Sequence, residues 1–197
     1  MTESRFKIVG KDKLSRVFQH KHYLFQRKIL GSELHVYDNS SNVVFYLRQK
    51  PFSLKKDFRV YADENMNREL LVIKIPIFTL WSTSTYNIEE PIIGKKIGSI
   101  VRWAWKGNYE YIFSSLDGQE MGKLITTRVS FSLKQRHIIR DNEQEIAEIE
   151  PYYNPFIPRC SLRIISPESN IDVRLLIAAG ILFVQLELGL DNVFRSF

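Results

Sequence analysis

The sequence has little cysteine: Cys160 is its only one among 197 residues. A single cysteine can form neither an internal disulfide nor a cysteine-based zinc site, which excludes disulfide-stapled folds and zinc ribbons. Cys160 lies between Arg159 and Ser161 in an apparent strand, and a nucleophilic role is not expected. This composition suits a reducing compartment.

Other chemical signatures are absent as well. The segment Gly94–Gly98 lacks the spacing of a phosphate-binding loop and the Ser/Thr after its lysine, and no Gly-x-Ser-x-Gly elbow occurs. His20 and His22 share one face of a strand but have no third metal ligand nearby, so we expect exposed polar residues. The acidic stretch 141–150 lacks the central glycine of an EF-hand and is interpreted as the solvated face of a strand. We therefore expect a protein that is not an enzyme, without a metal site or cofactor.

A long hydrophobic run is missing too, because the longest stretch without a polar side chain is Leu175–Val184, ten residues. A membrane-spanning helix needs about 20 apolar residues. Polar residues lie close on both sides of this run: Asp172, Arg174, Gln185 and Glu187. A helix that is apolar on every face is buried in protein or spans a membrane, and the short run favours burial. We predict a central helix over about 171–188, with Ser169 or Asn170 as its cap and Gly189 at its end.

What the sequence does contain is a series of short β-favouring runs separated by turn residues, from Lys21 onward. Asp117-Gly118, between two such runs, predicts a hairpin. About twelve strands with no helices between them must be mainly antiparallel, and a closed barrel could enclose the apolar helix. Ala178, Ala179 and Gly180 mark a place where strand side chains approach that helix closely. The predicted strands are Lys21–Ile29, Glu33–Asp38, Val43–Lys50, Asp57–Asp63, Arg68–Phe78, Ser82–Ile88, Lys96–Trp105, Tyr109–Ser115, Met121–Thr127, Lys134–Arg140, Glu143–Glu150 and Arg159–Ile165.

The positive charge is concentrated at the N-terminus. The chain has 28 Lys+Arg and 22 Asp+Glu, and residues 1–28 hold eight of the bases and two of the acids, so the remainder sums to zero. No signal peptide is predicted there. We expect a basic arm over residues 1–20 and a single barrel domain over 21–197. The arm is either flexible or docked on the barrel, or it is a segment that contacts an anionic membrane surface.

A second basic segment runs from Lys50 to Arg59, with Phe52 and Leu54 inside it. It is either an ordinary hairpin surface or a contact for anionic headgroups. The candidate lipid-binding residues are Lys50, Lys55, Lys56 and Arg59 from this loop, and Lys7, Lys11, Lys13 and Arg16 from the arm.

The segment Arg102–Lys106 interleaves basic and aromatic residues, as nucleic-acid-binding surfaces do. Trp103 and Trp105 share one strand face, and Arg102 and Lys106 share the other. We interpret this as a strand with a buried aromatic face, and no nucleic-acid partner is expected.

Several segments resemble one family when taken in order. Tyr46–Tyr61 and its continuation to Lys74 are similar to the first repeat-like portion of phospholipid scramblase-related and LURP-one-related proteins. Gly94–Ile100 matches the family's G-x-x-I-G strand entry. Ile171–Arg174 with the apolar run resembles the C-terminal helix of scramblases and of the tubby C-terminal domain. The resemblance implies a twelve-stranded barrel wrapped around that helix.

The chain departs from scramblases in three places. It has no proline-rich N-terminal region and no cysteine cluster for lipid attachment, and the segment Ser161–Asn170 before the helix offers one acid, Glu168, where calcium needs several oxygen ligands. Calcium-driven scrambling is therefore in doubt. Our first hypothesis is a cytoplasmic, peripheral protein that binds anionic phospholipid on the inner face of a membrane. The alternatives are a scramblase that moves phospholipid between leaflets, and a barrel whose mouth binds a protein or small ligand.

Overall fold

The structure is a computed structural model of the whole chain. It describes residues 16–28, 33–48, 57–75, 83–91, 94–105, 108–126, 137–141, 143–152, 154 and 157–188.

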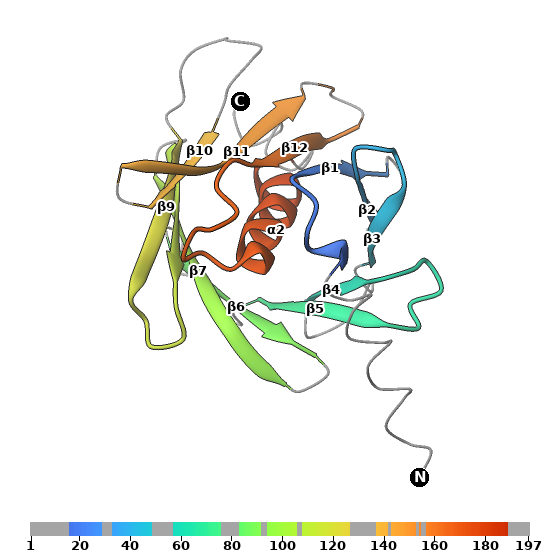
Figure 1. The fold of residues 1–197 in the computed structure, drawn as a ribbon, viewed down its shortest axis with the longest axis horizontal. Helices are drawn as coiled ribbons and strands as arrows, with labels where there is room; N and C mark the ends of the chain where they lie inside the picture. Colours follow the sequence, from blue (N-terminus) through green and yellow to red (C-terminus); the bar gives the residue numbers. More distant parts are fainter. Residues whose placement is uncertain are drawn as a thin grey trace.

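These residues form a closed antiparallel barrel of twelve strands, in which each strand pairs with the next and β1 closes the ring against β12 (Figure 1). The prediction of about twelve antiparallel strands in a closed barrel is confirmed. The strands are β1 (His22–Arg27), β2 (Glu33–Tyr37), β3 (Val43–Arg48), β4 (Phe58–Tyr61), β5 (Glu69–Lys74), β6 (Thr83–Glu90), β7 (Lys95–Trp105), β8 (Asn108–Ser114), β9 (Glu120–Thr126), β10 (His137–Asp141), β11 (Gln144–Tyr152) and β12 (Arg159–Ile164).

The apolar helix lies inside this ring, as predicted (Figure 1). Helix α2 (Val173–Leu182) continues as one wide π-helical turn, η1 (Phe183–Glu187). All of its residues from Leu175 to Val184 are buried. The predicted cap is wrong, because the chain stays non-helical through Asp172, whose carboxylate accepts a hydrogen bond from the Arg174 backbone N–H at 2.9 Å. The predicted stop, Gly189, lies outside the described residues.

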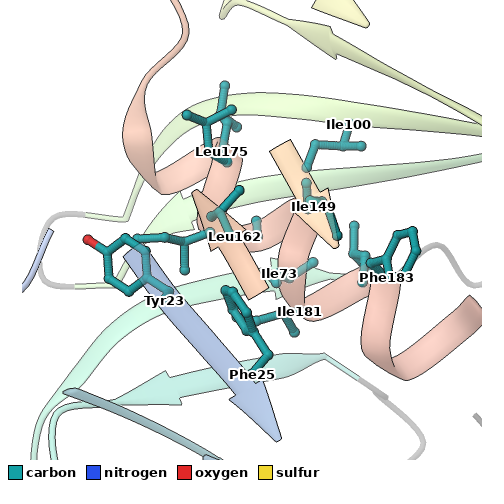
Figure 2. Close-up of a cluster of buried hydrophobic side chains, with 14 of the residues drawn as sticks. Tyr23, Phe25, Ile73, Ile100, Ile149, Leu162, Leu175, Ile181 and Phe183 are labelled. Atoms are coloured by element: carbon teal, nitrogen blue, oxygen red, sulfur yellow. The ribbon is translucent and has the colours of Figure 1, made fainter. Parts of the chain in front are cut away.

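The helix fills the barrel by direct contact with the inward side chains of the strands. Figure 2 shows Leu175, Ile181 and Phe183 of the helical segment among strand residues such as Phe25 and Leu162. Gly180 makes the closest approach, because a Cβ there would lie 2.6 Å from Cζ of Phe25. This confirms the close contact predicted at Gly180.

Successive strands alternate in direction, so the connections between them alternate between the two ends of the barrel. We call the end where β1 begins and β12 leads into α2 the entry end. The opposite end, where β1 stops and the helical segment finishes, is the exit end. The hairpin predicted at Asp117-Gly118 joins β8 to β9 at the entry end, with Gly118 at a φ of 85°.

Candidate functional site

The sequences of the connections at the two ends of the barrel differ in charge. Between consecutive strands, the exit-end connections contain eight basic residues and one acidic residue. The entry-end connections, including the one from β12 to α2, contain seven acidic residues and one basic residue. By sequence, the exit-end connections hold Lys28 and Asp57, which are described, and seven bases that lie outside the described residues: Lys50, Lys55, Lys56, Lys106, Arg128, Lys134 and Arg136. The entry-end residues are Asp38, Asp63, Glu64, Asp117, Glu143, Glu168, Asp172 and Arg68.

The zero net charge of residues 29–197 hides this separation. The charges of residues 29–197 sum to zero, but within this range the exit-end connections hold seven bases and one acid, and the entry-end connections hold seven acids and one base. By sequence, the exit-end connections therefore carry the charge that an anionic surface attracts, whereas the acidic entry-end connections lie on the side where the basic arm joins β1.

Only two of the candidate lipid-binding residues are described, and they do not lie together. Arg16 is exposed in a helical turn that leads into β1, at the entry end, whereas Arg59 is on β4, which starts from the exit end. The other candidates lie outside the described residues: Lys7, Lys11, Lys13, Lys50, Lys55 and Lys56.

Arg59 is already paired with an acidic side chain of the neighbouring strand. Its Nη1 lies 2.8 Å from Oε1 and 3.1 Å from Oε2 of Glu69 on β5. The pair is solvent-exposed, so its contribution to stability is about 0.2–1 kcal/mol. Arg59 can contact a headgroup only by sharing or giving up this partner.

The residues just after Arg16 are docked on the barrel. The ring centroid of Phe18 lies 5.3 Å from that of Phe45 on β3, and the Tyr23 hydroxyl donates to the Val17 carbonyl at 3.1 Å. Val17 and Phe18 pack against the hydrophobic core. The chain is therefore fixed to the entry end from residue 17 onward, and the division at residue 20 stays a prediction.

Arg102 and Trp103 of β7 face the opposite way from the prediction, whereas Lys106 and the side chain of Trp105 lie outside the described residues. Trp103 is 49% exposed on the outside of the barrel, and Arg102 points inward, so the interpretation of a buried aromatic face is wrong for Trp103. The inward arginine is satisfied by Glu187 at the end of η1. Glu187 is 85 residues from Arg102 in the sequence, so no local pattern predicted this pairing.

Arg102 and Glu187 form a two-pronged ion pair that holds the end of the helical segment to the wall. Nε of Arg102 lies 2.6 Å from Oε1 of Glu187, and Nη2 lies 3.1 Å from Oε2. The Tyr111 hydroxyl donates to the same Oε1 at 2.7 Å. Burial lowers the pKa of Arg102, but the hydrogen bonds and charge of Glu187 outweigh it and raise that pKa. The guanidinium therefore stays charged.

A second arginine fastens the start of α2. Nη1 of Arg174 lies 3.0 Å from Oε2 of Glu90 at the end of β6, and Nη2 lies 2.6 Å from Oδ2 of Asp172. Both helix ends are thus tied to the β6–β7 hairpin. This arrangement is structural and offers no free group for chemistry.

Burial shifts the pKa values of His137 and Cys160, two titratable groups of the core. His137 is 4% exposed and packs its ring 5.0 Å from that of Phe183, and burial lowers its pKa to about 4. Cys160 is fully buried against α2, and burial raises the pKa of its thiol. His137 is thus neutral at pH 7, and Cys160 is shielded as an uncharged thiol.

The residues weighed as metal ligands are dispersed. Across the described ranges, no three His, Cys, Asp or Glu side chains are grouped as a metal ion would require. His20 and His22 are half-buried, not exposed as expected. In the acidic stretch, Glu143 and Glu145 are exposed as expected, but Glu148 is 4% exposed and pairs with Arg163 of β12.

The comparison with protein families shows which family the chain belongs to. A family model described as LURP-one-related matches residues 6–184, which is most of the chain. The chain belongs to the LURP-one-related family. The barrel around a helix agrees with the tubby-like fold that the resemblance implied. No curated protein and no solved structure matches this LURP-one-related chain. Within the described part of the chain, no helix has the length and apolar character needed to cross a membrane.

Proposed function

We propose that this LURP-one-related barrel binds anionic phospholipid at a membrane surface, as a non-enzymatic, peripheral protein of the cytoplasm. The observation that supports the proposal is the charge separation between the ends. The exit-end connections carry eight bases and one acid, and Lys50, Lys55 and Lys56 supply three of those bases from a single connection.

The electrostatic attraction expected from these basic residues is strong enough for reversible attachment to an anionic membrane. A basic residue near an anionic leaflet contributes about 1 kcal/mol, so a few of them acting together give an attraction of several kcal/mol. The attraction fades over a Debye length of about 8 Å at physiological salt, whereas a six-residue strand already spans roughly 20 Å. The acidic entry end is therefore too far away to cancel the attraction when the exit end faces the lipid.

The N-terminal arm is a second contact that can be separated from the first. Lys7, Lys11, Lys13 and Arg16 precede β1, so they join the barrel at the entry end. We assign the primary contact to the connection that holds Lys50, Lys55 and Lys56, with Arg59 at its edge. The arm then adds affinity only where it reaches the same surface.

The test is co-sedimentation with vesicles at low and high salt. The full chain should pellet with phosphatidylserine-containing vesicles at low salt, pellet less at high salt, and remain in the supernatant with neutral phosphatidylcholine vesicles. A chain without residues 1–15 retains Val17 and Phe18 and should keep most of this binding.

A matched pair of charge reversals tests the assignment to the exit end. Lys55→Glu with Lys56→Glu should abolish most of the binding. Lys21→Glu with Lys95→Glu changes the net charge equally at exposed entry-end positions and should have little effect. Failure of the unaltered chain to bind anionic vesicles at low salt would reject the proposal, and equal loss in both variants would reject the assignment.

Lipid scrambling is the alternative that the same vesicles can test. Dye quenching across the bilayer should show no exchange between leaflets, because α2 is buried and tied to the wall at both ends. Exchange that depends on the protein would favour the scramblase alternative.

A further inference from the structure

The large exposed apolar side chains differ between the two ends of the barrel. At the exit end they are aromatic: Trp103, 49% exposed, is two residues from the end of β7, and Tyr152, 37% exposed, is the last residue of β11. At the entry end they are aliphatic: Val43, Leu116 and Ile165. These five are the large apolar side chains that are exposed among the described residues.

The two aromatic residues are suited to an interface between lipid and water. Indole and phenol rings combine an apolar body with a polar edge, and they concentrate at the headgroup level of membranes. Tyr152 also has the guanidinium of Arg159 over its ring, 5.2 Å from the centroid. A cation and an aromatic side chain are therefore paired at this rim, and both can interact with a phosphate-bearing headgroup layer.

The positions of these residues around the ring define an orientation. β7 and β11 are four strands apart in the twelve-strand ring, so Trp103 and Tyr152 lie about a third of the circumference from each other. Two contacts that far apart on one rim restrict the tilt of the barrel on a flat surface.

We propose that the barrel docks end-on, with its exit end toward an anionic lipid surface and with Trp103 and Tyr152 inserted at the headgroup level. The inference rests on the proposed function and adds to it the docking face, the anchoring residues and the direction of the barrel axis. In this orientation α2 points its last turn at the membrane, and the acidic entry end faces the solvent.

The first test compares two exposed side chains at opposite ends. Trp103→Ala should weaken binding to phosphatidylserine-containing vesicles by about tenfold, because a half-exposed indole loses its burial in the interface. Leu116 is 53% exposed at the tip of the β8–β9 hairpin, so Leu116→Ala is the matched control and should change binding less than about twofold. Thermal unfolding of each variant shows that the fold is kept.

A second measurement reports the orientation of the bound protein directly, without a comparison of affinities between variants. Because Cys160 is fully buried, a fluorescent label that senses polarity can be attached to a new cysteine without removing the native one. A label at Tyr152→Cys should brighten and shift to the blue when anionic vesicles are added. A label at Leu116→Cys should not change, and unsubstituted protein should take up no label.

The outcomes separate the two proposals. If the unaltered chain binds vesicles but the label at 116 responds and that at 152 does not, or Leu116→Ala weakens binding as much as Trp103→Ala, end-on docking is overturned while lipid binding stands. If binding is normal in Trp103→Ala and both labels are silent, the exit-end aromatics are not anchors, and contact with a protein becomes the better explanation for them. If the unaltered chain does not bind anionic vesicles at low salt, both proposals fail.

Discussion

Substitution of Gly180 by alanine tests how tightly the barrel encloses its helix. Gly180 is in α2, where alanine is normally preferred over glycine by about 1 kcal/mol. In this barrel, however, the added methyl carbon would lie 2.6, 2.7 and 3.1 Å from three ring atoms of Phe25, whereas carbon atoms in contact prefer about 3.5–4.0 Å.

The outcome depends on whether Phe25 can move. Phe25 is fully buried on β1, opposite Cys160 of β12, whose Sγ lies 4.0 Å from the Gly180 carbonyl oxygen. Overpacking of a closed core typically costs about 1–3 kcal/mol, and steric overlap with a ring held on both sides falls in the upper part of that range. After subtraction of the helix preference, we expect Gly180→Ala to lower the free energy of unfolding by about 1–2 kcal/mol.

Urea unfolding followed by far-UV circular dichroism gives the free energy, and two further variants isolate the cause. Ala179→Gly in the same helix should cost about 1 kcal/mol or more, which calibrates the backbone preference. Phe25→Leu removes the overlapping ring, so adding Gly180→Ala to that variant should be neutral or stabilising. If Gly180→Ala raises the stability of the otherwise unaltered chain, or lowers it equally with and without Phe25, steric contact with this ring is not what limits the position.

Three further predictions concern buried polar groups. Glu187→Ala should lower the free energy of unfolding in urea by about 2–4 kcal/mol, because it leaves Arg102 unpaired, whereas Arg102→Met combined with Glu187→Leu should cost much less; equal losses would contradict this account. Because the folded pKa of His137, about 4, is below the unfolded value of about 6.5, its contribution is complete above pH 6.5 and is lost as pH falls toward 4. Unaltered protein should therefore lose about 2 kcal/mol more than His137→Phe between pH 7 and pH 5, and identical pH profiles would show that His137 is not the cause. Cys160 should react with thiol reagents only when the barrel opens, so its labelling rate should rise with urea in step with unfolding; rapid labelling of native protein would contradict its burial.

Much of the fold could be predicted from local patterns. Short β-favouring runs and turn residues such as Asp117-Gly118 located the strands, and a helix apolar on every face required a surrounding wall. These features depend on neighbours in sequence, which is why they could be read without the structure.

The direction in which a strand presents its faces could not be predicted in the same way. Alternation in β7 places Arg102 and Trp103 on opposite faces but does not say which face is inside. The usual rule puts the tryptophan inside; here Glu187, 85 residues away, accepts the arginine there. The cap at Asp172 depended likewise on where the chain enters the barrel, which the local sequence did not specify.

The charge separation was present in the sequence but was hidden by summation over the whole body. Once antiparallel strands are counted, their connections can be assigned alternately to the two ends, and the basic and acidic groups then separate. The candidate residues Arg16 and Arg59 were grouped by charge alone, and the alternation of strand direction places their attachment points at opposite ends.

Closure of the barrel between its first and last strands also affects how the protein can fold. The pair Phe25–Cys160 joins residues separated by most of the chain, and the core is incomplete until α2 fills it. The ribosome must synthesise the chain through Glu187 before β12 can pair with β1 and the helical segment can fill the barrel interior. Such long-range pairing makes folding slow, so nascent chains spend time with apolar strand faces uncovered. We therefore expect this domain to complete its folding after synthesis, during which it is a natural client for chaperones that hold unfinished β-sheets.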